Sequence, residues 1–297
     1  MSLFARIGRI VLIVLIAALV AILYDWYANV HPPHSSDAAL EGNSTAGETV
    51  WVTANGLRLK ARAYHSPQMS NHPVLVIVLH GDSPFHAPSY QYIFARIAAA
   101  EIPNIIAAAV LRPGYTDDVG DTSSGIRGHT TGDNYTPENV GAIASAATQL
   151  KAKYDASKVI MAGHSGGATI SADILGRAPG VADGALLVSC PCDVYAFRKH
   201  MAQKQLNPMW LEPVKSLSPL DWVPEIPSTT LVRMLVGDKD SIAPPELTQE
   251  YATALRARHI DVVVTEVPGK DHEIFLEPVV FEQLGLLVKD VEDAVAP

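Results

Sequence analysis

Basic residues are scarce in this sequence. Among its 297 residues, 22 are lysine or arginine and 31 are aspartate or glutamate, which gives a formal net charge of -9 at pH 7. A protein that binds nucleic acid is expected to carry a basic patch that matches the phosphate backbone. The composition therefore argues against a nucleic-acid partner.

Cysteine is scarcer still, because the chain has only Cys190 and Cys192. A metal site needs more ligands than this pair supplies, and His31 and His34 likewise have no third or fourth ligand at a useful spacing. We therefore expect neither a metal nor a cofactor. The two thiols would close a tight ring if they paired, so a disulfide and two free thiols both remain open. A cysteine nucleophile is disfavoured because no histidine lies at a matching position.

Long apolar runs are also missing, apart from one near the N-terminus. Ile10–Tyr24 is unbroken, yet it is shorter than the roughly 20 apolar residues that cross a hydrocarbon core. Arg6 and Arg9 precede the run, and Trp26 and Tyr27 follow it, as suits residues at a membrane interface.

Residues 1–28 are therefore interpreted as a membrane anchor or a secretory signal peptide. A signal peptide needs small residues at positions −3 and −1 of its cleavage site, and cleavage after Ala28 would put Trp26 at −3. We favour an uncleaved anchor for this reason. In either case the basic residues before the run predict that the following domain is extracytoplasmic, either membrane-anchored or secreted.

Residues 29–48 form a linker rich in proline, glycine and serine, and residues 49–297 are enough for one large α/β domain. The domain opens with a predicted hairpin, because Asn55-Gly56 separates two β-rich runs at Thr49–Thr53 and Leu57–Tyr64. Strands and helices then alternate, which predicts a mostly parallel, eight-stranded type of sheet with helices on both faces. Strands are predicted at Val74–Leu79, Ile105–Leu111, Lys158–Ala162, Ala185–Ser189, Thr230–Val236 and Val262–Val267, and helices at Ser89–Ala100, Thr136–Tyr154, Ala168–Leu175, Pro245–His259 and Pro278–Val295.

The strand that ends at Ala162 runs into Gly163-His164-Ser165-Gly166-Gly167 and then into a helix. This is the G-x-S-x-G nucleophile elbow in its strand–turn–helix context. The turn is sharp, so the neighbours of the serine must lack side chains, and Gly163 and Gly167 meet that need. The N-terminus of the following helix favours negative charge at the serine. Ser165 is therefore the predicted nucleophile.

Two later strands also end in candidate catalytic residues. Gly237-Asp238-Lys239-Asp240 follows one strand, and Pro268-Gly269-Lys270-Asp271-His272 follows the last. A serine hydroxyl needs a base, and the base needs a carboxylate to orient it. The carboxylate and His272 occur here in the chain order serine, acid, histidine.

With these three motifs, the chain from Thr49 onward resembles the α/β-hydrolase superfamily. The acidic segment of that family reads G-x-x-D-x-x-(V/A)-P, which matches Gly237 to Pro244 and implies that Asp240, rather than Asp238, is the triad acid. The resemblance implies a serine hydrolase that forms an acyl-enzyme through Ser165, Asp240 and His272.

The oxyanion hole of such an enzyme needs two backbone N–H groups. Gly166 supplies one as the residue after the nucleophile, and the resemblance implies that Asp82, in the loop after an early strand, supplies the other. A carboxylate beside an oxyanion is unfavourable, so we expect the Asp82 side chain to point away. A structural role for it is favoured over contact with a cationic substrate. Arg112 is expected to hold its own loop.

About 40 residues separate the strands near Ser189 and Thr230, where the family usually carries a cap. Helices are expected at Val194–Gln205 and Trp210–Lys215, so the cap is small and leaves the cleft fairly open. Ser218-Pro219-Leu220-Asp221 resembles the dienelactone hydrolase and prolyl-oligopeptidase branches. We predict hydrolysis of a small or medium carboxylic ester. The alternatives are a serine peptidase or amidase, acyl transfer by the same triad, and a non-catalytic binding module on the same fold.

Overall fold

The computed structural model describes residues 47–129 and 131–294. The segment 1–28, interpreted as an anchor or signal peptide, lies outside these residues, as does nearly all of the linker. Across the two described ranges, no helix is long and apolar enough to cross a membrane. The predictions made for residues 1–28 therefore stay predictions.

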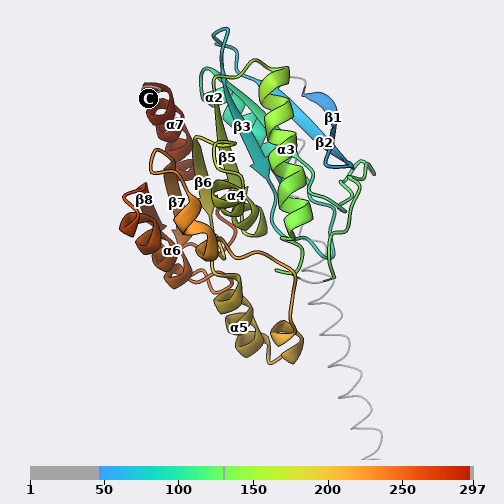
Figure 1. The fold of residues 1–297 in the computed structure, drawn as a ribbon, viewed down its shortest axis with the longest axis vertical. Helices are drawn as coiled ribbons and strands as arrows, with labels where there is room; N and C mark the ends of the chain where they lie inside the picture. Colours follow the sequence, from blue (N-terminus) through green and yellow to red (C-terminus); the bar gives the residue numbers. More distant parts are fainter. Residues whose placement is uncertain (1–46, 130, 295–297) are drawn as a thin grey trace, which may run out of the picture. The chain divides into compact units, whose positions relative to one another are not determined.

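One sheet of eight strands organises the domain, in the order β1-β2-β4-β3-β5-β6-β7-β8 (Figure 1). The hairpin of β1 (Glu48–Ala54) and β2 (Leu57–His65) turns at Asn55 and Gly56, which both have positive φ. Strand β2 is antiparallel to its neighbours, and the remaining pairs are parallel, as the alternation of elements predicted. The other strands are β3 (Val74–Leu79), β4 (Ile105–Val110), β5 (Lys158–His164), β6 (Gly184–Val188), β7 (Leu231–Gly237) and β8 (Asp261–Val267).

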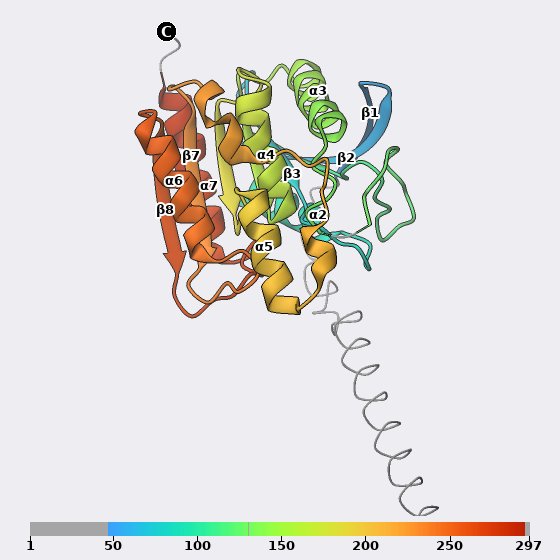
Figure 2. The same cartoon turned by 60° about the horizontal axis from the view of Figure 1, so that its bottom comes forward.

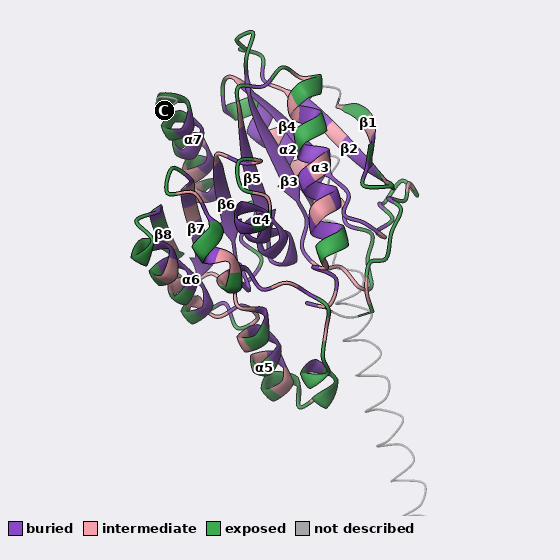
Figure 3. Cartoon of the chain, in the orientation of Figure 1, coloured by how far each residue is buried: buried purple, intermediate pink, exposed green. Residues whose placement is uncertain are grey.

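Helices cover both faces of this sheet (Figure 2). Alternate residues of a strand point to opposite faces, and β3 shows this directly. Its residues 75, 77 and 79 belong to one apolar core together with residues of α3 (Pro137–Lys153), α4 (Gly166–Arg177) and α6 (Pro245–Ala257). Residues 74, 76 and 78 belong to a second apolar core together with residues of α2 (Tyr90–Glu101) and α7 (Pro278–Asp293). Buried strands therefore lie between helices. The outer faces of α3, α6 and α7 are exposed, whereas α4 is buried along nearly its whole length (Figure 3).

A small insert lies between β6 and β7, beyond the carboxyl ends of the central strands (Figure 1). The predicted helix Val194–Gln205 is observed as α5. The predicted helix Trp210–Lys215 is wrong, because a 3-10 turn, η2 (Pro208–Leu211), occupies this place instead. Pro213 explains the early end, since proline lacks an N–H and disfavours helix in the residue before it. A second 3-10 segment, η3 (Pro219–Glu225), was not predicted.

Candidate active site

Ser165 sits at a strained turn between β5 and α4. Its φ of 51° and ψ of -120° are costly for a residue with a side chain. The turn is possible because the residues around Ser165 are glycines. A Cβ on Gly163 would lie 2.4 Å from the backbone of Gly167, and a Cβ on Gly167 would lie 2.4 Å from the carbonyl oxygen of Leu79. The elbow motif therefore has the local geometry that its glycines require.

Gly166 begins α4 and lies directly against Asp82. A Cβ on Gly166 would come within 2.6 Å of the Asp82 carboxylate and 2.6 Å of the Tyr135 hydroxyl. The backbone N–H groups of Gly166 and of Asp82 are both without a hydrogen-bond acceptor among the described residues.

His272 and Asp240 are hydrogen-bonded in the loops after β8 and β7. Nδ1 of His272 lies 2.8 Å and 3.0 Å from the two carboxylate oxygens of Asp240. The backbone N–H groups of Ile242 and Ala243 also donate to this carboxylate, each at 2.9 Å. Burial tends to raise the pKa of Asp240, but the hydrogen bonds from His272 and the two amides lower it below the usual value. Asp240 is therefore an ionised partner that fixes the ring of His272.

Asp238 has a different neighbour. Its carboxylate accepts a hydrogen bond from the backbone N–H of Gly269 at 2.7 Å, and the residue is exposed. The structure therefore brings Asp240, and not Asp238, to the histidine.

No hydrogen bond joins the Ser165 hydroxyl to His272 among the residues that the structure describes. Catalytic hydrogen bonds are often long in the free enzyme and tighten when substrate binds. The two residues are linked indirectly, because the carbonyl of His272 contacts the ring of His164, the neighbour of Ser165.

The Asp82 side chain points into the protein and is held there by three donors. Nη2 of Arg112 lies 2.8 Å from one carboxylate oxygen, while the hydroxyl of Tyr135 and the N–H of Gly132 lie 2.6 Å and 2.7 Å from the other. Arg112 is fully buried and also donates to the carbonyl of His80. The carboxylate of Asp82 and the guanidinium of Arg112 thus form a structural ion pair beneath the loop.

His164 does not serve as a base in this geometry. Nδ1 of its ring is 2.9 Å from the Tyr90 hydroxyl, and Nε2 is 3.0 Å from the carbonyl oxygen of His272. Burial, together with the nearby His272, lowers the pKa of His164 to about 3. The ring is therefore neutral, and both of its nitrogens are occupied by protein groups.

One group of possible metal ligands lies at the site among the described residues: His164, His272 and Glu273, with ligand atoms within 4.8 Å of one another. The donors of this group do not suit a metal ion. A histidine binds metal through a nitrogen lone pair, whereas the nitrogens of His164 face Tyr90 and a carbonyl, and Nδ1 of His272 faces Asp240.

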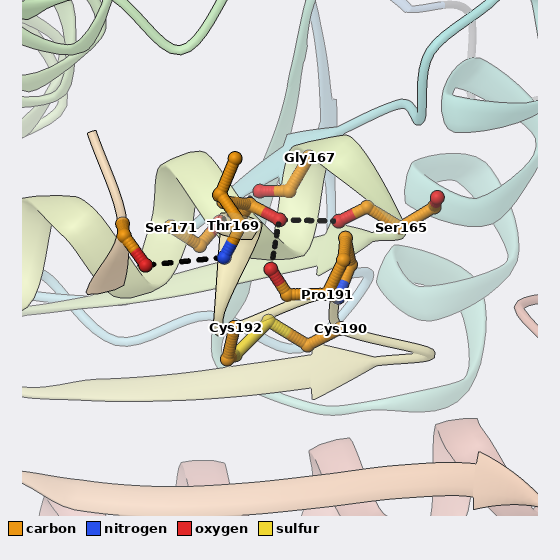
Figure 4. The surroundings of a disulfide bond; sticks show 9 residues. Ser165, Gly167, Thr169, Ser171, Cys190, Pro191 and Cys192 are labelled. Atoms are coloured by element: carbon orange, nitrogen blue, oxygen red, sulfur yellow. Dashed lines mark hydrogen bonds between the residues drawn. A yellow bond between two sulfur atoms is a disulfide. The ribbon is translucent and has the colours of Figure 1, made fainter. Parts of the chain in front are cut away.

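Cys190 and Cys192 form a disulfide, with Cα atoms 5.2 Å apart. The sequence had left this pairing open. Both cysteines are buried, and the ring lies beside the start of α4 (Figure 4). The Thr169 hydroxyl is 3.3 Å from the Ser165 carbonyl and 3.5 Å from the Pro191 carbonyl, so it connects the disulfide segment to the elbow.

A cavity of about 250 Å³ lies between the loop after β3 and the insert. Pro84 and Phe85 line it on one side, and Met209 and Trp210 of η2 line it on the other. His129, in the long loop after β4, also lines it. Ser165 and His272 do not line this cavity, and Pro84 and Phe85 belong to the same loop as Asp82.

Three contacts at the site involve residues that sequence reasoning missed. Tyr135 holds Asp82, Tyr90 holds His164, and Ser189 donates its hydroxyl to the carbonyl of His272 at 3.0 Å. Ser189 stands at the carboxyl end of β6, where functional residues gather in such sheets, so its position was a usable signal. The two tyrosines carry no comparable motif.

Neither a family model nor a curated protein matches this sequence. Solved structures do match. Puromycin hydrolase has a TM-score of 0.67 at 18% identity, over 84% of this chain and 40% of that chain. Acylaminoacyl peptidase from Pyrococcus horikoshii has a TM-score of 0.64 at 11% identity, over 86% of this chain and 43% of that chain. An esterase from Pyrobaculum calidifontis has a TM-score of 0.60 at 17% identity, over 86% of this chain and 87% of that one.

This chain has the α/β-hydrolase fold. The predicted fold class is therefore confirmed. The chain spans less than half the length of the puromycin hydrolase and of the acylaminoacyl peptidase, and most of the length of the esterase.

Proposed function

We propose that this chain is a serine hydrolase that cleaves a small or medium carboxylic ester through an acyl-enzyme. The observation that carries the proposal is the Asp240–His272 hydrogen bond, formed by strand-end loops beside a strained serine elbow. An ionised carboxylate that orients a histidine next to an activated serine is the arrangement that acyl transfer needs.

In the proposed reaction, His272 takes the proton of Ser165 as the hydroxyl oxygen attacks the ester carbonyl. The N–H groups of Gly166 and Asp82 hold the resulting oxyanion. The imidazolium of His272, stabilised by Asp240, then protonates the leaving alcohol and an acyl-enzyme remains. Water attacks this intermediate with His272 again as base, which releases the acid and restores Ser165. No step requires a metal or cofactor.

The size of the cavity beside the loop of Asp82 supports a small or medium substrate. Its volume of about 250 Å³ is enough for one alkyl or aryl group of a substrate, and it shares His129 and Met209 with a second cavity of about 880 Å³. Mostly apolar walls of Pro84, Phe85, Met209 and Trp210 suit an alkyl or aromatic group of an ester. We place the acyl or alcohol portion of the substrate here.

A serine peptidase or amidase is the second candidate, because puromycin hydrolase and acylaminoacyl peptidase share the fold. An enzyme that trims free amino termini needs a carboxylate to bind the ammonium group. Asp82 and Asp133 are the two candidates for that role. Arg112, Tyr135 and Gly132 already occupy the oxygens of Asp82, and one oxygen of Asp133 accepts the N–H of His129. This favours esters. Acyl transfer to added alcohols and a non-catalytic binding role are the remaining alternatives.

Active-site labelling tests the proposal. A fluorophosphonate probe should label Ser165 and abolish hydrolysis of short-chain p-nitrophenyl esters, and Ser165→Ala should remove both labelling and turnover. Ser171→Ala, which removes another buried hydroxyl from α4, is the matched control and should keep activity. Labelling of another serine would contradict the nucleophile. A higher kcat/KM for aminoacyl-naphthylamides than for esters at equal enzyme would favour the peptidase, and product analysis with added alcohols would reveal acyl transfer.

The cavity assignment has its own test within η2. Met209 lines the cavity, whereas Leu211 of the same turn does not, and their exposed fractions are similar at 55% and 64%. Met209→Ala should lower kcat/KM for a propionate ester relative to an acetate ester by about fourfold, the value of the one buried methylene by which the two esters differ. Leu211→Ala should leave that ratio unchanged. Equal effects at both positions would remove the substrate from this cavity.

We also propose that residues 1–28 keep the domain at the outer face of the cytoplasmic membrane. The disulfide supports an oxidising compartment, since such bonds are rare in the cytosol. A C-terminal reporter should be active only when exported, and sequencing of the mature N-terminus should return an intact Met1. A reporter active in the cytoplasm would contradict export, and a new N-terminus near residue 28 would indicate a signal peptide.

A further inference from the structure

His164, the residue before the proposed nucleophile, is enclosed by aromatic rings. The centroid of its ring lies 5.1 Å from that of His272, 5.5 Å from that of Phe275 and 5.6 Å from that of Tyr90. Only 3% of the residue is exposed. Any influence of His164 on the reaction must therefore pass through protein groups.

The hydrogen bonds of His164 determine where its proton lies. Nε2 lies 3.0 Å from the carbonyl oxygen of His272. A carbonyl can only accept, so Nε2 carries the hydrogen and Nδ1 of the neutral ring is an acceptor. The Tyr90 hydroxyl, 2.9 Å from Nδ1, is then the donor. Burial and the proximity of His272 keep the pKa of His164 near 3, so this arrangement holds throughout the neutral range.

The same hydroxyl has a second partner in the loop after β3. The backbone N–H of Gly81 donates to the oxygen of Tyr90. A continuous series of donors therefore runs from Gly81 through Tyr90 and His164 to the carbonyl of His272. One end of the series is Gly81, which precedes Asp82, the residue whose N–H is proposed to bind the oxyanion. The other end is His272, the proposed base. A Cβ on Gly81 would lie only 3.1 Å from Cβ of Ser165, so this loop is in contact with the nucleophile.

We infer that Tyr90 and His164 are positioning residues, which fix the oxyanion loop and the loop of His272 relative to each other and thereby support turnover. The inference rests on the proposed function, because it assigns these residues to the same reaction. Hydrogen bonds in series between buried groups hold geometry that loose packing would not. A displacement of about 1 Å at a reacting group can cost on the order of a hundredfold in rate.

Removal of one hydroxyl tests the Tyr90 link. Tyr90→Phe keeps the ring that packs on His164 and Phe275 but leaves the Gly81 N–H and Nδ1 of His164 unpaired. We expect kcat to fall by about tenfold to a hundredfold with KM within about twofold of the parent. Tyr92→Phe is the matched control, because it deletes a buried hydroxyl from the same helix. That hydroxyl donates to the carboxylate of Asp117 at 2.9 Å and is not part of the series. It should leave kcat within about twofold.

Two substitutions at His164 separate positioning from packing. His164→Phe fills the aromatic site and removes both hydrogen bonds. His164→Gln packs less well, but its amide nitrogen can still donate to the His272 carbonyl. If the hydrogen bond from residue 164 to the His272 carbonyl positions the base, the kcat of His164→Gln is higher than that of His164→Phe. A purely packing role predicts the opposite order and would overturn the inference.

Hydrogen–deuterium exchange supplies a readout that does not depend on turnover. In Tyr90→Phe, amides of residues 80–83 and of residues 271–275 should both exchange faster, whereas Tyr92→Phe should change neither. Unchanged exchange in the second segment, or kcat equal to that of the Tyr92→Phe control, would contradict the positioning role. A failure of the fluorophosphonate to label Ser165 in the parent chain would instead contradict the proposed function, and the exchange result would still decide whether the two loops are linked.

Discussion

Two carboxylates stand on opposite sides of Ser165 and are held in different ways. Asp82 is surrounded by side-chain and backbone donors and pairs with Arg112, whose guanidinium is fully buried. Asp240 accepts two backbone amides and keeps its remaining hydrogen-bonding capacity for the ring of His272. The first arrangement fixes a loop, whereas the second leaves an ionised group beside a base that can gain a proton. Burial of a carboxylate near a nucleophile therefore does not identify its role, but the nature of its partner does.

The strongest test of this contrast replaces Asp240. Asp240→Asn should lower kcat by about 10⁴-fold, because an amide no longer holds the imidazole in the correct tautomer or stabilises its cation. Ester hydrolysis at saturating substrate measures the loss, and circular dichroism verifies the fold. Asp238→Asn is the matched control and should change kcat by less than about threefold, since its exposed carboxylate accepts a hydrogen bond from the N–H of Gly269 and none from His272 among the described residues. A larger loss at Asp238 would reverse the assignment.

Sequence alone was sufficient for the sheet and for the three site motifs, because both depend on local patterns. Unbroken apolar runs such as Val74–Leu79 predict buried parallel strands, and the glycines around Ser165 predict its sharp turn. The insert was harder to predict, since η2 and η3 are short 3-10 segments without apolar periodicity, and each begins at a proline. The partners of Asp82 could not be predicted either, because Arg112 and Tyr135 reach it through long-range packing of a loop without regular structure.

The other side of the contrast should appear in stability. Asp82→Asn leaves the Arg112 cation buried without its counter-ion, so we expect the free energy of unfolding to fall by about 3–5 kcal/mol. Urea titration followed by tryptophan fluorescence measures this loss. Glu48→Gln, which breaks the exposed pair with Lys153, is the control and should cost no more than about 1 kcal/mol. A loss for Asp82→Asn as small as that of the control would mean that the ion pair does not hold the loop.

A third carboxylate sharpens the comparison, because Asp173 of α4 has neither kind of partner. The residue is completely buried, and neither of its oxygens has a hydrogen-bond partner within the described ranges. Burial, and then the charge of Asp221, raise the pKa of Asp173 well above its usual value, and Arg177 opposes them only in part. The folded protein therefore holds this proton more tightly than the unfolded chain does.

The consequence for stability has a definite sign. A carboxyl group whose pKa is higher in the folded protein than in the unfolded chain contributes stability in its protonated form. This stability is fully present below the unfolded-state pKa, which is near 3.8, and is lost as pH rises through the folded-state pKa. Asp173→Asn cannot ionise, so the free energy of unfolding of the variant should increase relative to that of the parent as pH rises from 4 to 8. Urea titrations at pH 4, 6 and 8 measure the gain, and Asp118→Asn, at an exposed position, controls for the loss of one negative charge. The difference in the free energy of unfolding between Asp173→Asn and the parent could instead stay constant or shrink as pH rises. Asp173 would then be ionised in the folded protein. Its environment would have to supply a partner as effective as those of Asp82 and Asp240.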